Sequence, residues 1–263
     1  MPANIHPTAI VAEGAIVPES TKIGPFCTVG PHVVLGEDCE LISHVVLDGH
    51  TTIGRGNRFF PFASVGIEPQ DLKYKNEPTR CVLGDDNVIR ESVTISRGTV
   101  GGGGVTHIGS GCLIMAYVHI GHDCRIGNGC ILANATTLAG HVIVEDYVTT
   151  PALGPVHQYC TLGKYAYIGG GTTITQDVLP FSLTSVERNN HAYGLNKVGL
   201  QRKGFTDEQL RKLTTAMRLL IGGKLNTTQA LEALNDMIAD GAGDEHVQYL
   251  IDFVKKSERG VIK

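Results

Sequence analysis

The sequence has no tryptophan and few aromatic or charged residues. Of its 263 residues, 6% are aromatic and 18% are charged, and the formal net charge is -4. This balance argues against a generally basic surface of the kind that binds nucleic acids. No apolar run approaches the roughly 18 residues that would span a membrane. Residues 1–20 contain two glutamates and three prolines, so we expect neither a transmembrane segment nor a signal peptide.

Glycine is abundant where aromatic residues are scarce. The chain has 33 glycines, and 42% of its residues are hydrophobic. Because the glycines follow no Gly-x-y period, collagen is excluded, and the apolar content is too high for a disordered chain. The length suffices for one large domain or two modest ones with a buried core. This composition indicates a repetitive fold.

Apolar residues recur every sixth position along most of the chain. The series runs from position 5 to 65, returns in phase at 83, 89 and 95, and continues one residue out of phase from 108 to 174. Thr150 is its only polar member. The residue two places earlier is almost always small, and positions i−2 and i share one face of an extended segment. Each hexad therefore predicts a short strand with one large and one small inward side chain, and three such strands close a coil of about 18 residues.

The cysteines follow the same pattern. All seven occupy the small inward position of a hexad, namely Cys27, Cys39, Cys81, Cys112, Cys124, Cys130 and Cys160. We expect them to be buried free thiols that pack as small apolar side chains, rather than disulfides or metal ligands. Free thiols fit a reducing compartment, so we expect a cytoplasmic protein.

The hexad series is interrupted near 66–80 and 97–106, where we expect outward loops, and it ends at Pro180. From Thr206 the apolar period becomes helical. Thr206 and Gln209 form a capping-box pattern, a second helix is expected from Asn226 or the next residue, and a third from about Asp244. The predicted domains are therefore a β-helix over 1–184 and a connecting segment with a small helical domain over 185–263.

Basic residues gather where the helical part begins. Between positions 197 and 225, seven basic residues stand against two acidic ones. This cluster is either a solvated helix face or a docking surface for an acidic partner or for phosphates.

A group of polar residues falls on one predicted corner of the coils. His122 and Asp123 follow the inward Ile120, and one coil later the same positions hold Gly140 and His141. Neighbouring coils lie about 4.8 Å apart, so we expect these side chains to meet. A neutral histidine can act as a general base, a carboxylate can orient it, and a backbone N–H can bind an oxyanion.

Gln158 lies one further coil along this corner, with His157 beside it. No serine or cysteine is available there as a nucleophile, so the base would activate a substrate hydroxyl without a covalent enzyme intermediate. The alternative is a stack of solvent-facing histidines. The spacing of His119 and His122 does not fit the zinc site of hexapeptide-repeat carbonic anhydrases, and we expect no metal.

The hexads resemble the hexapeptide-repeat proteins, which implies a left-handed parallel β-helix. Longer motifs make the chain similar to the acyl-ACP–UDP-N-acetylglucosamine O-acyltransferase family over essentially its whole length. These motifs are Ile5-His6-Pro7-Thr8-Ala9, Gln70-Asp71-Leu72-Lys73-Tyr74, Arg90-Glu91-Ser92-Val93-Thr94-Ile95, Arg97-Gly98-Thr99, His119-Ile120-Gly121-His122-Asp123-Cys124, Leu138-Ala139-Gly140-His141, Val156-His157-Gln158 and Asn189-Asn190-His191-Ala192.

The resemblance implies transfer of a 3-hydroxyacyl chain from acyl carrier protein to the 3-hydroxyl of UDP-N-acetylglucosamine, the first step of lipid A biosynthesis. His122 would be the base, Asp123 its partner and Gly140 the oxyanion donor. The implied substrate-binding residues are Asp71, Lys73, His141, His157, Gln158, Gly170, His191, Asn196, Arg202 and Lys203, of which Gly170 would leave room for a long acyl chain.

The resemblance also implies a homotrimer with sites between neighbouring prisms and no cofactor beyond the phosphopantetheine of the carrier protein. The alternative is a related hexapeptide N-acyltransferase that acts on an amino sugar nucleotide. A non-catalytic β-helix would show regular outward threonine rows and no interrupting loops, and neither feature is present.

Overall fold

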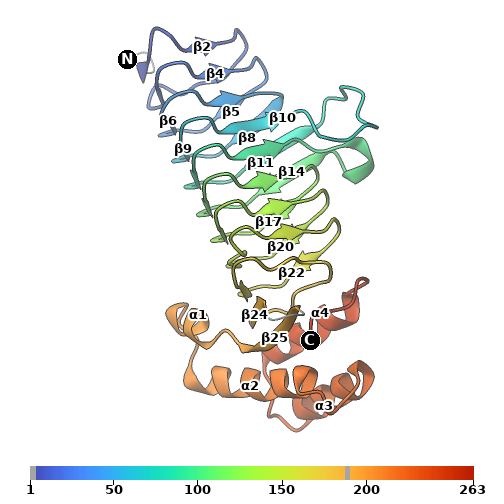
Figure 1. Ribbon diagram of the computed structural model, residues 1–263. Coiled ribbons are helices and arrows are strands. Elements are labelled where there is room, and N and C mark those ends of the chain that lie inside the picture. Colours follow the sequence, from blue (N-terminus) through green and yellow to red (C-terminus); the bar gives the residue numbers. More distant parts are fainter. Residues whose placement is uncertain (1–3, 187–189) are drawn as a thin grey trace.

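The computed structural model describes residues 4–186 and 190–263, in which a tall three-sided stack of short strands is followed by a helical end (Figure 1). The first sheet contains β1 (Asn4–Ile5), β3 (Lys22–Ile23), β6 (Glu40–Leu41), β9 (Arg58–Phe59), β12 (Val88–Ile89), β15 (Leu113–Ile114) and β18 (Ile131–Leu132). The second contains β2 (Ile10–Val11), β4 (Thr28–Val29), β7 (Val46–Leu47), β10 (Ser64–Ile67), β13 (Thr94–Ser96), β16 (His119–Ile120), β19 (Thr137–Leu138) and β21 (Pro155–Val156). The third contains β5 (Val34–Leu35), β8 (His50–Ile53), β11 (Arg80–Leu83), β14 (Val105–Ile108), β17 (Arg125–Ile126), β20 (Ile143–Val144) and β22 (Thr161–Leu162).

The hexad pattern explains this architecture. Strands pair in parallel with the equivalent strand of the next coil, so that Ile120 lies opposite Leu138 and Ile126 opposite Val144. From Ile23 onward the apolar residues of the hexads point inward and form one continuous core, whereas Ile5 in the first coil is exposed. All seven cysteines are buried in that core as free thiols, as predicted. The predicted parallel β-helix with a helical C-terminal part is confirmed.

The two insertions leave the core as outward loops. The first, residues 68–79, connects β10 to β11, and Val65 still pairs with Ile95, so the inserted length preserves the hexad phase. The second follows β13 and contains the 3₁₀ turn η1 (Val100–Gly102). Ile95 pairs with Ile120, 25 residues later, which accounts for the change of phase after the second loop.

The corners of the coils use left-handed backbone conformations. Asp123, His141 and Tyr159 occupy equivalent corner positions with φ angles of 62°, 63° and 64°. Left-handed conformations are uncommon for residues with a Cβ atom. Because Phe62 and Tyr165 adopt the same conformation at other corners, it is a property of the coil and not by itself a mark of function.

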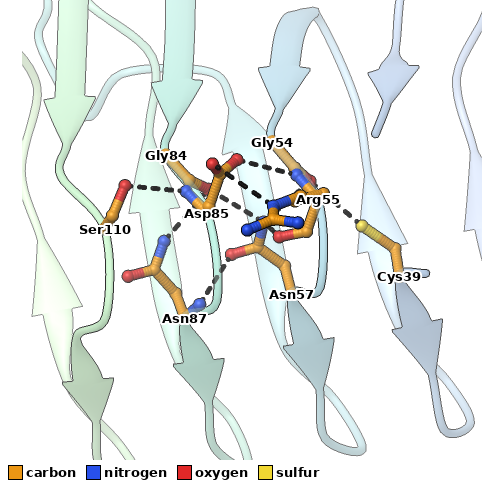
Figure 2. Close-up of polar contacts among 8 residues, drawn as sticks. All are labelled: Cys39, Gly54, Arg55, Asn57, Gly84, Asp85, Asn87 and Ser110. Atoms are coloured by element: carbon orange, nitrogen blue, oxygen red, sulfur yellow. Dashed lines mark hydrogen bonds and ion pairs between the residues drawn. The ribbon is translucent and has the colours of Figure 1, made fainter. Parts of the chain in front are cut away.

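A buried amide ladder joins the coils that carry the insertions. Figure 2 shows Asn57 and Asn87 on neighbouring coils, both with no exposed surface. The Asn57 side chain donates to the carbonyl oxygens of Gly54 and Gly84 at 2.8 Å, and its Oδ1 accepts from the Asn87 N–H at 3.0 Å. Asn87 continues the ladder, because its Oδ1 accepts from the Cys112 N–H at 2.8 Å. Satisfied amides of this kind fix the register of neighbouring coils.

The C-terminal part begins with a small sheet and continues in helices. The sheet contains β23 (Tyr167–Ile168), β24 (Ser182–Val186) and β25 (Asn190–Leu195), and the helices are α1 (Lys197–Arg202), α2 (Asp207–Ile221), α3 (Thr227–Ala239) and α4 (Glu245–Lys256). The three predicted helices and the capping box of Thr206 with Gln209 are confirmed. The short helix α1 and the β24–β25 hairpin had no sequence signal, and the predicted boundary at 184/185 falls inside β24.

Aromatic side chains attach this part to the last coils. Tyr165 stacks on Phe181 with ring centroids 5.9 Å apart, and both rings contact Phe205 edge-on. The extreme C-terminus returns to the β-helix, where the Ser257 hydroxyl donates to the buried carboxylate of Asp177 at 2.7 Å. None of the described helices combines the length and apolar character needed to cross a lipid bilayer.

Candidate active site

His122 and Asp123 form a hydrogen-bonded pair at the corner after β16. Nδ1 of His122 lies 2.8 Å from Oδ2 of Asp123. The Asp123 side chain is fully buried and that of His122 is 17% exposed. An ionised carboxylate can only accept, so this contact places a proton on Nδ1 and leaves Nε2 with a free lone pair. The pair thus has the arrangement of a histidine base with its orienting carboxylate.

The second loop closes over the carboxylate of Asp123. The Thr99 N–H donates to Oδ1 at 2.8 Å, and the Thr99 hydroxyl donates to Oδ2 at 2.6 Å. The Asp123 N–H in turn donates to the hydroxyl of Thr106 at 2.8 Å. Both carboxylate oxygens are therefore satisfied, which offsets the cost of burying the charge.

Gly140 packs against the imidazole of His122, as the coil spacing predicted. A Cβ atom at this position would lie 2.5 Å from Cε1 and 2.8 Å from Nε2 of His122. Any larger residue at this position would therefore displace the His122 imidazole. Among the described residues, no protein acceptor binds the Gly140 N–H. This N–H is available for an oxygen that develops negative charge near Nε2.

A cavity of about 240 Å³ lies beside this corner, and its walls include both loops and the next coil. Asp71 and Lys73 line it from the first loop, and His141 and Tyr159 line it from the coils. The rings of His141 and Tyr159 stack 4.5 Å apart. Burial lowers the pKa of His141, although the charges of Asp123 and Asp71 oppose the shift. His141 is thus held towards its neutral form, in which it can accept or donate a hydrogen bond.

The first loop is fixed by Arg97, the first residue of the second loop. The Arg97 guanidinium donates to the Tyr74 hydroxyl at 2.8 Å and to the Gly66 carbonyl oxygen at 3.0 Å. The Asp71 side chain closes its own turn by accepting from the Lys73 N–H at 2.9 Å. These contacts hold Asp71 and Lys73 at the mouth of the cavity.

Other predicted site residues lie further from the His122–Asp123 pair. His157 and Gln158 are exposed on the following coil, and the His157 ring contacts the Gln158 carbonyl oxygen. Gly170 lies at a different edge, between β23 and the strand position of Ile174. A Cβ atom at Gly170 would meet only the Ala152 carbonyl oxygen at 3.7 Å, so the space beside it is open.

The predicted nucleotide-end residues form a second group on another corner. Asn196, Arg202 and Lys203 line a cavity of about 590 Å³ together with Tyr147 and Tyr165. The Lys203 ammonium lies 4.3 Å from the centroid of the Tyr147 ring.

Asn196 also has a structural role, because its side chain accepts from the Gly199 N–H and caps α1. His191 lies in β25, and its side chain lies outside the described residues.

His122, Asp123 and His141 each place one ligand atom within 4.8 Å of the others, which could hold a metal ion. Asp123 already accepts two hydrogen bonds from Thr99, and one of these shares Oδ2 with His122. A metal ligand at Oδ2 would compete with both contacts. The absence of a catalytic metal stays a prediction.

Sequence reasoning did not assign functional roles to Thr99 or Tyr159. Tyr159 follows His141 by one coil, so the same spacing that located Gly140 could have found it. The contact between Thr99 and Asp123 crosses the second loop, whose path the repeat does not determine. His119 on the second sheet was also left out of the site, and its Nδ1 lies 2.8 Å from the Thr94 hydroxyl.

Comparisons with known proteins agree over the whole chain. Residues 177–262 match the model of UDP-N-acetylglucosamine O-acyltransferase domain 2, and residues 106–140 match the bacterial transferase hexapeptide model. An acyl-[acyl-carrier-protein]–UDP-N-acetylglucosamine O-acyltransferase from Thermodesulfovibrio yellowstonii is 43% identical over 259 residues, which cover 98% of this chain and 99% of the relative.

Solved structures give the same result. The UDP-N-acetylglucosamine O-acyltransferase (LpxA) of Moraxella catarrhalis is 39% identical with a TM-score of 0.94, over 99% of this chain and 100% of its own. LpxA from Acinetobacter baumannii is 39% identical with a TM-score of 0.93, over the same shares of the two chains. The fold is the left-handed β-helix that the resemblance implied. The chain therefore belongs to the UDP-N-acetylglucosamine O-acyltransferase family of hexapeptide-repeat enzymes.

Proposed function

We propose that this enzyme transfers a 3-hydroxyacyl group from acyl carrier protein to the 3-hydroxyl of UDP-N-acetylglucosamine, the first step of lipid A biosynthesis. Family membership supports the substrates, because the relative from Thermodesulfovibrio yellowstonii bears that name. The observation that carries the chemistry is the His122–Asp123 pair, whose free Nε2 lies beside the Gly140 backbone.

The proposed reaction needs one base and one oxyanion donor. Nε2 of His122 takes the proton of the sugar hydroxyl while that oxygen attacks the thioester carbonyl. The Gly140 N–H stabilises the tetrahedral oxyanion. When the intermediate collapses, the C–S bond breaks, and the protonated His122 returns its proton to the departing phosphopantetheine sulfur. No covalent enzyme intermediate forms, and no further cofactor is needed.

The position of the polar groups supports a homotrimer. In one chain, Asp71, Lys73 and His141 lie at one corner, whereas Asn196, Arg202 and Lys203 line a cavity at another. A nucleotide sugar would contact both groups where such corners of neighbouring subunits meet. Leu72, which is fully exposed at the tip of the first loop, is an apolar side chain that such a neighbour would cover.

Acyl carrier protein is the proposed donor, and the basic C-terminal part is its proposed docking surface. Lys197 and Arg218 line a cavity of about 510 Å³ whose other walls include the apolar residues Leu195, Met217 and Ile221. Cations around an apolar floor suit an acidic partner helix with an apolar anchor. The buried free thiols support a cytoplasmic location, where these substrates would be available.

The test is a transfer assay with 3-hydroxyacyl carrier protein as donor and UDP-N-acetylglucosamine as acceptor. We expect an O-acylated nucleotide sugar, and its ester is identified by cleavage in mild alkali. His122→Ala should abolish turnover while circular dichroism stays unchanged. A wild-type enzyme that acylates only the 3-amino analogue would replace this proposal with the amino sugar alternative. A folded His122→Ala enzyme with normal turnover would exclude the proposed mechanism.

A further inference from the structure

Thr99 has no part in the chemistry described above. It nevertheless donates two hydrogen bonds to the Asp123 carboxylate, whereas His122 makes one. The Thr99 N–H and hydroxyl bind one carboxylate oxygen each. We propose that Thr99 is a positioning residue, which fixes the Asp123 carboxylate so that Oδ2 faces Nδ1 of His122. This inference rests on the proposed function, since it assigns the second loop a role in orienting the catalytic base.

The direction of the Thr99 hydroxyl is determined by its two partners. The hydroxyl oxygen accepts from the Gly102 N–H at 3.2 Å, and its proton therefore points away, towards Oδ2 of Asp123 at 2.6 Å. A chain of donors runs from the loop backbone through Thr99 to the carboxylate. A hydroxyl held in this way supplies its hydrogen bond without an entropic cost at each turnover.

The loop backbone is shaped around the same carboxylate. A Cβ atom at Gly102 would lie 2.0 Å from Cγ of Asp123, so only glycine allows this approach. Gly98 has a similar constraint, because its Cβ atom would lie 2.3 Å from the Val105 nitrogen. The glycine-rich sequence of the second loop thus permits the turn η1 to cover Asp123 and present Thr99 to it.

Thr99 also caps η1, so a change here can loosen the loop as well as release Asp123. Kinetic constants separate the two effects. If Thr99 acts through Asp123, Thr99→Val lowers kcat by about ten- to one-hundredfold, as expected for one lost hydrogen bond to a charged group. KM for the nucleotide sugar should change by less than about threefold.

Two variants accompany this measurement. Thr99→Ser keeps the hydroxyl and should restore kcat to within about threefold of the wild type. Thr21→Val is the matched control, because Thr21 is also a buried threonine but lies in an early coil away from the site. This control should leave both constants unchanged.

A double-variant cycle tests whether Thr99 works through Asp123. In an Asp123→Ala background, Thr99→Val should change kcat by less than about twofold, because the carboxylate it orients is absent. Gly102→Ala offers an independent route, since its methyl group must displace the Asp123 carboxylate. It should lower kcat in the wild type and have little further effect in the Asp123→Ala background.

The outcomes distinguish this inference from the proposed function. Wild-type enzyme without acyl transfer would contradict the proposed function. Normal transfer that is lost in His122→Ala but kept at full kcat in folded Thr99→Val would overturn only the role of Thr99. Additive losses in the double variant would likewise show that Thr99 acts on something other than Asp123.

Discussion

Nδ1 of His122 lies 2.8 Å from Oδ2 of Asp123, and solvent does not reach that carboxylate. The carboxylate therefore has a single orientation, and His122 has one tautomer, with its lone pair on Nε2. The hydrogen bond therefore orients His122 so that Nε2 can act as a general base.

Replacing the carboxylate by its neutral isostere tests this directly. Asp123→Asn can present its amide N–H to Nδ1, which would move the proton of His122 to Nε2 and remove the base. We expect kcat to fall by about 10²- to 10⁴-fold. KM for the nucleotide sugar and the thermal midpoint should remain close to wild type. A kcat within threefold of wild type would contradict the assigned tautomer.

Gly140→Ala should affect His122 rather than the fold. The added methyl group would lie 2.5 Å from Cε1 of the imidazole, so the ring must turn away. The Gly140 N–H is retained, and a loss of at least about tenfold in kcat would therefore report the displaced base. A crystal structure of the variant would show the new ring position. An unmoved ring with normal turnover would contradict the close packing.

Gly170→Met should change the preferred acyl length. The space beside Gly170 is open, since a Cβ atom there has only the Ala152 carbonyl oxygen within 4 Å. Because a Cβ atom fits there without a clash, we expect the substitution to change stability little. We expect the ratio of kcat/KM for long and short 3-hydroxyacyl donors to move towards shorter chains. Unchanged selectivity would remove Gly170 from the acyl site.

Asn87→Leu should destabilise the β-helix. Its side chain donates to the Gly109 carbonyl oxygen at 2.9 Å and accepts from the Cys112 N–H at 2.8 Å, and both partners are buried. Leucine leaves these backbone groups unpaired, at a cost of about 2–5 kcal/mol in the free energy of unfolding. Urea unfolding measures the change.

Asn128→Ala provides the comparison for Asn87. Asn128 also accepts from a backbone N–H, that of Ser110 at 2.8 Å, but it is exposed to water. Its loss should cost less than about 1 kcal/mol. Equal effects at the two sites would show that the buried ladder has no special role.

The stability of the enzyme should depend on pH through His119. Burial lowers the pKa of this histidine, and the neighbouring His122 adds to the shift. The unfolded chain therefore takes up the proton first as the pH falls, and the free energy of unfolding decreases below about pH 6.5. His119→Gln should flatten this part of the stability curve and leave the curve above pH 8 unchanged in shape. Urea titrations at several pH values measure it.

The sequence predicts the β-helix well because each hexad carries its own inward and outward positions. Because the coils stack, residues about 18 positions apart in the sequence lie next to each other. This spacing predicted that His122 and Gly140 would be in contact. The same rule fails across the insertions. Thr99 reaches Asp123 through a loop whose path depends on tertiary contacts such as that of Gly102.

The hexad repeat also did not predict the segment that connects the β-helix to the helices. The β24–β25 hairpin forms where no period of two or of six continues. Its strand β24 pairs with β23, and β25 pairs with β24. Asn196 illustrates a second difficulty. A residue selected for substrate binding also caps a helix that the sequence did not reveal.

The amide ladder has a consequence for how the molecule opens. A β-helix is nearly one-dimensional, because each coil contacts only its neighbours, and it frays from its ends. Unwinding from the N-terminus must break the contacts of Asn57 and then of Asn87 before it reaches the coil of His122. Backbone amides on the C-terminal side of this ladder should therefore exchange with deuterium more slowly than those of the first coils. The first coils can then unfold transiently while the catalytic corner stays folded.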